Sequence, residues 1–275
     1  MIRMVGLDLD GTLLRQDKSI SDYSRDILRR ASALGTVIVP VTGRPLAGVP
    51  SAVKCLPGVR YCITSNGAAV YDLKEGKVIK EVLMKPETVL SVLSAAQGLC
   101  LIREVFTGGW GYHEHKDYEM LKKRFAGTPV MPYIDSSRKK TGSLEEFVRN
   151  RKEGFENISI MSGCSGDREE IRRRLEGITG INVILPWKTD LEITDGKAEK
   201  GDALLFLAER LGIGREETMA AGDSDNDLSL LRKAGLALAM GNASVHIKEA
   251  ADYITEDNEH DGAARAVERF ILEEH

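Results

Sequence analysis

The sequence predicts an α/β protein whose strands pair in parallel, with a second domain inserted into the first. Short apolar segments alternate with amphipathic helical segments along most of the chain, a pattern typical of α/β folds. From about residue 84 to residue 190 the pattern changes, because the elements become shorter and the charged runs denser. We therefore expect a core formed by residues 1–83 and 191–275, and a separate domain formed by residues 84–190.

The first core segment opens with an apolar strand that runs into Asp8. Ser21 and Asp22 can cap a helix that extends to about Gly35, since both residue types favour helix N-termini. The further elements expected here are a buried strand at 36–42, a helix beginning near Pro45, two strands within 61–72 joined by an Asn-Gly turn, and a turn at Gly76.

The α/β alternation returns after residue 190. Residues 200–212 have the pattern of an amphipathic helix that ends at Gly212. The elements that follow are a strand in ETMAAGD, a helix in DLSLLRKAG, a strand in LALAMG, a short strand in ADYIT and a C-terminal helix.

Composition narrows the possible functions. With 275 residues and 42% hydrophobic content, the chain can build one sizeable core or two modest ones without disulfides. A net charge of −4 with mixed signs argues against strong non-specific binding of nucleic acids. The 4 cysteines lack zinc-like spacing, so we expect reduced, buried thiols. No apolar run has the length of a membrane span, and the first apolar stretch meets Asp8 too soon for a signal peptide. We expect a cytoplasmic protein with no membrane partner.

Polar residues follow three of the predicted strands, in LDLDGT, VTGR and AAGDSDND. In open parallel sheets, ligands bind outside the carboxyl ends of the strands, so these three stretches should open onto one crevice. Side chains at i and i+2 of a strand point the same way. We therefore expect the carboxylates of Asp8 and Asp10 to lie together, which requires a nearby positive charge.

Two acidic clusters at strand ends favour a metal site over simple turn-forming aspartates. A calcium-binding EF-hand loop is excluded, because it needs glycine at its sixth position and glutamate at its twelfth. Leu13 and Ser19 occupy these positions when the count starts at Asp8. Asp8, Asp10, Asp223 and Asp227 would together present about four negative charges to a hard divalent cation, and Mg²⁺ suits few carboxylates combined with water and phosphate oxygens.

Phosphate chemistry fits these residues. An aspartate can act as a nucleophile and form an aspartyl-phosphate, and a second aspartate two residues later can transfer protons. Lys200 lies at a predicted helix N-terminus, where its charge opposes the helix dipole, so an anion nearby would explain it. Thr42 and Lys200 could bind the transferring oxygens.

At this level the chain resembles the haloacid dehalogenase (HAD) superfamily phosphatases. LDLDGTLL matches their first motif, VTGR the second, Lys200 with Gly201 the third and GDSDND the fourth. ITSNGA, LEI and AMGNA are similar to the Cof-type branch. The resemblance implies a Rossmann-like parallel-sheet HAD core with an inserted α/β cap domain, which would be residues 84–190.

The resemblance also implies a role for each matching residue. Those roles are: Asp8 as nucleophile and metal ligand; Asp10 as general acid/base whose backbone carbonyl binds the metal; Thr42 and Lys200 as phosphate ligands, with Lys200 also orienting Asp8; Asp223 as a Mg²⁺ ligand; Asp227 as support for the metal's waters or for Lys200; Asn226 as a contact of the phosphoryl region; and Gly43, Arg44 and Asn66 as the floor of the site.

We therefore expect a Mg²⁺-dependent phosphohydrolase that acts on a small phosphorylated metabolite, with a sugar phosphate as the expected substrate, and without nucleic-acid partners. A sugar-phosphate mutase would share the same core residues. A catalytically silent phospholigand-binding protein is the remaining alternative. The sequence leaves the oligomeric state open between monomer and homodimer.

Overall fold

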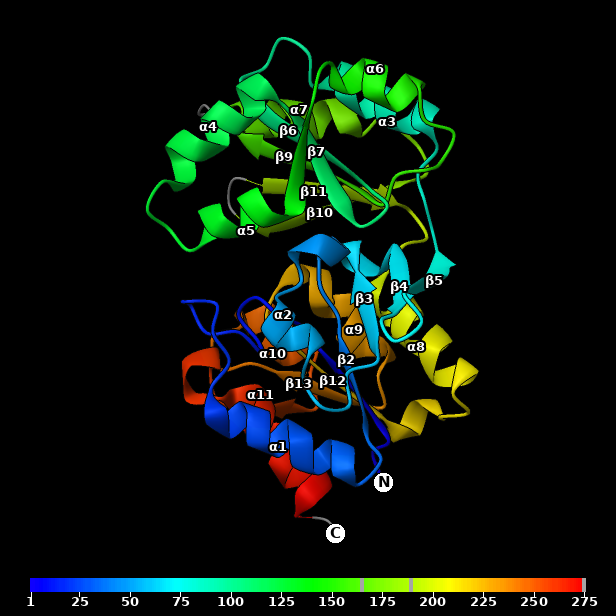
Figure 1. Ribbon diagram of the computed structural model, residues 1–275, viewed down its shortest axis with the longest axis vertical. Helices are drawn as coiled ribbons and strands as arrows, with labels where there is room; N and C mark the ends of the chain where they lie inside the picture. The colour runs from blue at the N-terminus through cyan, green and yellow to red at the C-terminus, as the bar shows by residue number, and fades with distance from the viewer. Residues whose placement is uncertain (164–165, 188–189, 274–275) are drawn as a thin grey trace. The chain divides into compact units, whose positions relative to one another are not determined.

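The computed structural model describes residues 1–163, 166–187 and 190–273 (Figure 1). Its contacts divide the chain into two compact units. The first unit comprises Met1–Gly43, Val49–Lys80 and Glu199–His275, and the second comprises Arg44–Gly48 and Glu81–Ala198. Within the described ranges, no helix combines the length and the apolar content that a bilayer crossing requires.

The first unit is built on a parallel sheet of five strands in the order β14-β13-β12-β1-β2. These strands are β1 (Met4–Leu7), β2 (Val37–Pro40), β12 (Thr218–Gly222), β13 (Leu236–Ala239) and β14 (Tyr253–Ile254). In this order the carboxyl ends of β1 and β12 are neighbours, because Leu7 pairs with Ala221. The predicted parallel α/β class is confirmed.

Helices pack on both faces of this sheet. They are α1 (Asp22–Ala33), α2 (Ser51–Lys54), α8 (Lys200–Arg210), α9 (Leu228–Lys233), α10 (Val245–Glu249) and α11 (Gly262–Val267). Val5 and Leu7 share an apolar cluster with residues of α1 and α11, whereas Met4 lies in a second cluster with residues of α8. This alternation follows from the two-residue period of a strand. Each fully buried apolar side chain contributes roughly 1.5–3 kcal/mol relative to an exposed one.

A smaller sheet of three strands completes the first unit. Its strands are β3 (Tyr61–Thr64), β4 (Ala69–Asp72) and β5 (Lys77–Glu81). The first two form the predicted antiparallel pair, and Gly76 turns the chain toward β5 with a φ of +62°. The helix expected near Pro45 is only a 3-10 turn at Leu46–Gly48, followed by the short helix α2.

The second unit holds a six-stranded sheet in the order β10-β11-β9-β6-β7-β8. Its strands are β6 (Leu101–Thr107), β7 (Trp110–Glu114), β8 (Arg138–Thr141), β9 (Asn157–Ser162), β10 (Ile181–Trp187) and β11 (Asp190–Asp195). Its helices are α3 (Pro86–Ala95), α4 (His115–Phe125), α5 (Val130–Ser137), α6 (Leu144–Arg149) and α7 (Asp167–Leu175). Residues of α3, α6 and α7 share one apolar cluster with the sheet, and residues of α4 and α5 share another.

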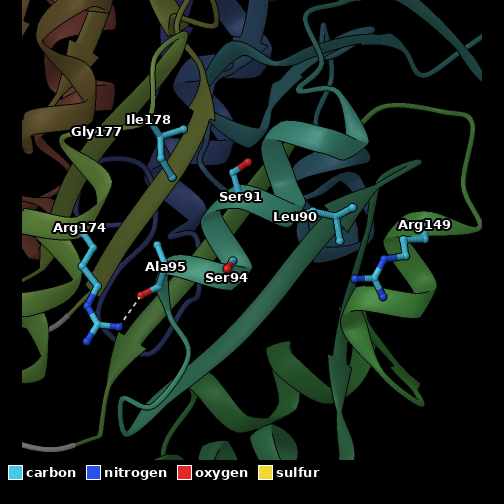
Figure 2. A pocket seen from close by; sticks show the side chains of 8 residues that line it. All are labelled: Leu90, Ser91, Ser94, Ala95, Arg149, Arg174, Gly177 and Ile178. Carbon is cyan, nitrogen blue, oxygen red and sulfur yellow. Dashed lines mark hydrogen bonds between the residues drawn. The ribbon is translucent and has the colours of Figure 1, made fainter.

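A groove of about 560 Å³ lies among α3, α6 and the end of α7 (Figure 2). Its polar lining includes Arg149, Arg174, Ser91 and Ser94. Arg174 Nη1 donates to the carbonyl oxygen of Ala95 at 3.0 Å, at the C-terminus of α3. None of the 8 residues that line the groove is acidic, so it offers no carboxylate to a cation.

Two expectations need correction. Leu191–Ile193, expected in the second core segment, lie in β11, which pairs antiparallel with β9 and β10 of the second unit. The cysteines were expected to be buried, and Cys62 is, but Cys55 and Cys100 are exposed free thiols. Both end up exposed because they lie where chain segments turn, after α2 and before β6. Cys164 lies outside the described residues.

Candidate active site

Three aspartates of the first unit form a compact acidic cluster. Asp8 directly follows β1, and Asp223 and Asp227 follow β12, the neighbouring strand in the sheet. One carboxylate oxygen from each residue lies within 4.8 Å of the other two. Asp8 is 4% exposed and Asp227 is fully buried. The convergence of these two strand ends, predicted from the sequence, is present in the structure.

Lys200 joins two members of this cluster. It is the first residue of α8, and its side chain is fully buried. Its Nζ donates to Asp8 Oδ1 at 2.8 Å and to Asp227 Oδ1 at 2.6 Å. The two carboxylates explain how a buried ammonium can occupy a helix N-terminus, where the helix dipole opposes it.

Asp227 has both carboxylate oxygens engaged by the protein. Oδ1 accepts from Lys200, while Oδ2 accepts the backbone N–H groups of Asp223 at 3.0 Å and Ser224 at 3.1 Å. Its carboxylate therefore fixes both the lysine and the loop that carries Asp223. Asp8 differs, because its Oδ2 accepts no hydrogen bond from any described residue and stays available for chemistry.

Glycines allow these elements to approach closely. A Cβ at Gly201 would lie 2.2 Å from the carbonyl oxygen of Ser229 in α9. A Cβ at Gly67, where φ is +94°, would lie 2.3 Å from the carbonyl carbon of Glu199, the residue before Lys200. Contacts this short do not occur, so both positions need glycine for α8 to begin where it does.

Asp223 is held by residues from two other loops. Its Oδ1 accepts from Thr12 Oγ1 at 3.0 Å. Asn242 Nδ2 lies 2.9 Å from the carbonyl oxygen of Gly11 and 3.4 Å from Asp223 Oδ2. Gly11 has a φ of +87°, and a Cβ there would lie 2.4 Å from Asp223 Oδ2. The loop after β1 is thus packed against the loop after β12, and a side chain at Gly11 would collide with Asp223.

The electrostatics of the cluster favour bound positive charge. Burial raises the pKa of Asp8 well above its usual range, and the charges of Asp227 and Asp223 raise it further, against the lowering effect of Lys200. Burial and the Asp227 carboxylate raise the pKa of Asp223 to about 7. Burial alone would lower the pKa of Lys200, but the charges of Asp227 and Asp8 hold it above its ordinary value. Three carboxylates against one ammonium leave the site short of positive charge.

This donor set fits a hard divalent cation. Asp8 and Asp223 offer carboxylate oxygens from adjacent loops, and Mg²⁺ takes one or two protein carboxylates while keeping several other oxygen ligands. The raised pKa values of both residues show that ionising them together is unfavourable without such a cation. Asp8 and Asp223 are therefore the residues that would hold Mg²⁺.

Hydrogen bonds link Asn226 to Asn66 and Asn66 to the backbone of Thr42 in the first unit. Asn226 Nδ2 donates to Asn66 Oδ1 at 3.1 Å, which joins the fourth-motif loop to the turn after β3. The backbone N–H of Asn66 donates to the carbonyl oxygen of Thr42 at 3.1 Å. Ser65 and Asn66 have φ values of +49° and +57°, a region that costs free energy for residues other than glycine. Gly43 follows Thr42 at the edge of this unit.

Arg44 belongs to the second unit. Its guanidinium carbon lies 4.4 Å from the centroid of the Tyr133 ring, and its Nη1 donates to the carbonyl oxygen of Gly48 at 3.0 Å. Its expected place in the floor of the site stays a prediction.

Asp10 lies after the end of β1, and the expectation that its carboxylate lies beside that of Asp8 stays a prediction. Asp10 is not a member of the acidic cluster, and its Oδ1 pairs with Lys18 Nζ at 2.7 Å. The strand β1 ends at Leu7. Beyond it the chain turns, with the N–H of Thr12 donating to the carbonyl of Leu9, so the same-side rule for strands does not apply. A metal contact from the Asp10 backbone carbonyl stays a prediction.

Three contributing residues were not singled out from the sequence. Thr12 and Asn242 lie within stretches already recognised as motifs, LDLDGTLL and AMGNA, so a closer look at the polar residues of those motifs could have found them. Lys18 lies in a turn with no motif of its own, and nothing in the sequence pairs it with Asp10.

Comparison with known proteins gives a consistent picture. A family model for haloacid dehalogenase-like hydrolases matches residues 5–267. The chain is 31% identical over 286 residues to Phosphatase YwpJ of Bacillus subtilis (strain 168), with 98% of this chain and 100% of the relative covered. It is 28% identical to the 5-amino-6-(5-phospho-D-ribitylamino)uracil phosphatase YcsE of the same organism, with 98% and 96% covered. Among solved structures, the HAD subclass IIB sugar phosphatase BT4131 is similar with a TM-score of 0.83 at 25% identity, with 98% of each chain covered.

Proposed function

Because the chain belongs to the haloacid dehalogenase-like hydrolases, we propose that it is a Mg²⁺-dependent phosphohydrolase that releases phosphate from a small phosphorylated metabolite. That it is a phosphatase of the Cof-type branch follows from the family match and from its phosphatase relatives. Beyond this class, we propose dependence on Mg²⁺, a covalent intermediate, roles for individual residues and a substrate class.

The observation that carries the proposal is the environment of Asp8. Lys200 fixes one of its oxygens at 2.8 Å, and the other accepts no hydrogen bond from the described residues. A carboxylate that is oriented by a buried ammonium and keeps one oxygen available is suited to attack phosphorus. The same ammonium can stabilise negative charge that develops on the transferring phosphoryl group.

The reaction would proceed in two displacements. In the first, an Asp8 oxygen forms a bond to phosphorus while the bond to the leaving oxygen breaks, and the Asp10 carboxyl group gives its proton to that oxygen. In the second, water attacks phosphorus, its proton passes to Asp10, and the bond between phosphorus and Asp8 breaks. Bound Mg²⁺ would supply shielding between the anionic nucleophile and the anionic substrate. Thr42 and Asn226 would bind phosphoryl oxygens.

The substrate class is proposed from the relatives. One acts on a phosphorylated ribityl compound, and another is described as a sugar phosphatase. A phosphate ester of a sugar or sugar alcohol is the chemistry that these two names share. Oligomeric state and the cytoplasmic location stay predictions.

The test is inorganic phosphate release from a panel of sugar phosphates, phosphoglycolate, pyridoxal phosphate and nucleotides, with Mg²⁺ and with EDTA. We expect Mg²⁺-dependent release from sugar phosphates, and an Asp8→Asn variant that folds normally but loses roughly 10⁴-fold or more in turnover. Near-full activity of Asp8→Asn would refute the covalent mechanism. Conversion of one sugar phosphate into another without release of phosphate would identify a mutase instead.

A further inference from the structure

Lys18 has a backbone conformation that lysine rarely adopts. Its φ is +68°, in the left-handed region where a side chain costs free energy and glycine or asparagine is common. The turn around it is closed by the N–H of Arg15, which donates to the carbonyl of Ser19 at 3.0 Å, and by the N–H of Lys18, which donates to the carbonyl of Arg15 at 2.9 Å. A strained non-glycine residue in a defined turn suggests a functional constraint on its side chain.

The side chain of Lys18 forms an ion pair with Asp10. The distance from Nζ to Oδ1 is 2.7 Å, and the two side chains are 29% and 30% exposed. Ion pairs with this much exposure add little to stability. The ion pair between Lys18 and Asp10 therefore contributes too little folding free energy to offset the cost of the strained backbone at Lys18.

The turn that carries Lys18 is anchored from outside. Arg15 Nη2 pairs with Asp261 Oδ2 at 3.0 Å, and the N–H of Gln16 donates to Glu259 Oε1 at 2.7 Å. Asp261 Oδ1 also accepts from Ser21 Oγ at 2.6 Å. These bonds to the C-terminal segment fix the turn, so the ammonium of Lys18 has a defined position beside Asp10.

We propose that Lys18 is a positioning residue that sets the orientation of the Asp10 carboxyl group for proton transfer. This inference rests on the proposed function, in which Asp10 protonates the leaving oxygen as the bond to phosphorus breaks. The acidic cluster of Asp8, Asp223 and Asp227 does not include Asp10. The ion pair with Lys18 supplies a constraint on the Asp10 side chain from a separate segment of the chain.

The consequence is a defect that depends on the leaving group. A p-nitrophenolate ion leaves without needing a proton, whereas phenolate is a poorer leaving group and benefits from protonation. A mispositioned acid should therefore slow cleavage of phenyl phosphate far more than cleavage of p-nitrophenyl phosphate. A residue with a purely structural role would slow both equally.

The experiment measures the rate of the first turnover by rapid mixing, with both aryl phosphates and saturating Mg²⁺. We expect the first-turnover rate of Lys18→Met to fall about 10-fold or more on phenyl phosphate and less than about 3-fold on p-nitrophenyl phosphate. The larger loss is smaller than the whole contribution of general acid catalysis, because Asp10 itself is still present. Lys18→Arg, which keeps the cation, should restore most of the rate. Lys18→Gly removes the amine and also relieves the backbone, so it should share the defect of Lys18→Met while its thermal midpoint stays equal or rises. Lys77→Met, at an exposed position of β5, is the matched control and should behave as wild type.

Equal losses on the two substrates, or wild-type rates in Lys18→Met, would overturn the role of Lys18. If Lys18→Met has wild-type rates but Asp10→Asn loses more rate on phenyl phosphate than on p-nitrophenyl phosphate, the proposed function stands without a role for Lys18. If wild type releases phosphate from neither compound nor from any member of the metabolite panel, the proposed function fails, and the role of Lys18 fails with it.

Discussion

Lys200 Nζ lies 2.6 Å from Asp227 Oδ1, and neither side chain exposes any surface to solvent. Removing one partner of a buried ion pair leaves the other charge uncompensated, at a cost of about 3–5 kcal/mol. Lys200→Met would leave the buried carboxylates of Asp8 and Asp227 without their cation, so we expect it to lower the free energy of unfolding by that amount, measured by urea denaturation. Arg29→Met is the control, because Arg29 pairs with Asp26 at the same 2.6 Å distance but on the exposed surface. It should change stability by less than about 1 kcal/mol, and equal losses in the two variants would contradict this account.

Mg²⁺ should stabilise the folded protein through Asp223. At a free Mg²⁺ concentration of 100 times the dissociation constant, the free energy of unfolding should rise by about 2.7 kcal/mol, seen as a higher thermal midpoint. Asp223→Asn should fold but lose this response, since it removes one of the two carboxylates assigned to the metal. Asp225→Asn lies in the same loop, where Asp225 pairs with His246 and is exposed, and it should keep the response. A full response in Asp223→Asn would place the metal elsewhere.

The pair of Asp72 and Arg60 predicts a pH dependence away from the active site. Hydrogen bonds from Arg60, the closest at 2.7 Å, hold the pKa of Asp72 below its ordinary value. A lowered pKa contributes stability that is present above the unfolded-state pKa of about 4 and is lost as the pH falls through the folded-state pKa. Asp72→Asn should therefore be less stable than wild type by a constant amount from pH 7 to pH 5, and the difference should shrink below about pH 4.

This pH series can be read from urea midpoints. Asparagine keeps an acceptor for the N–H groups of Lys74 and Glu75, which bond to Asp72 Oδ1, so the substitution removes mainly the charge. Arg60→Met removes the cation of the same pair, so its loss of stability relative to wild type should also shrink below about pH 4. If the cost of Asp72→Asn stayed constant down to pH 2, the ion pair would not be its source.

Gly201 should resist the substitution that usually stabilises a helix. Alanine in a helix is favoured over glycine by about 1 kcal/mol, but here its Cβ would meet the carbonyl oxygen of Ser229 at 2.2 Å. Gly201→Ala should therefore lose about 1–3 kcal/mol of stability, and turnover should fall because Lys200 shifts with the helix. Gly142→Ala is the control, since a Cβ there meets nothing within 4 Å. Urea midpoints and phosphate release measure both effects.

The sequence predicted the parts of the site that depend on regular structure. Asp8 and Asp223 each follow an apolar run, and neighbouring parallel strands bring such ends together whatever the loops do. Lys200 was predictable for a related reason, because a lysine that opposes a helix dipole calls for an anionic partner. The partners found, Asp8 and Asp227, are carboxylates of the protein itself.

The parts that escaped prediction depend on tertiary contacts beyond the ends of strands. Asp10 lies in the chain after β1 has ended, and its Oδ1 pairs with Lys18, eight positions along the chain. β11 pairs with β9, a partner about 30 residues earlier, and an apolar run alone does not reveal which sheet it joins. The exposure of Cys55 and Cys100 likewise reflects their place in the fold and not their residue type.

The position of Lys200 depends on an absence of atoms at Gly67, where a methyl group would collide with the peptide that joins Glu199 to Lys200. In a saturation library scored for turnover, this position should therefore tolerate as few replacements as the aspartates do, although it carries no reactive group. A design that transplants the four aspartates and the lysine into another parallel sheet would need to copy this gap as carefully as the side chains.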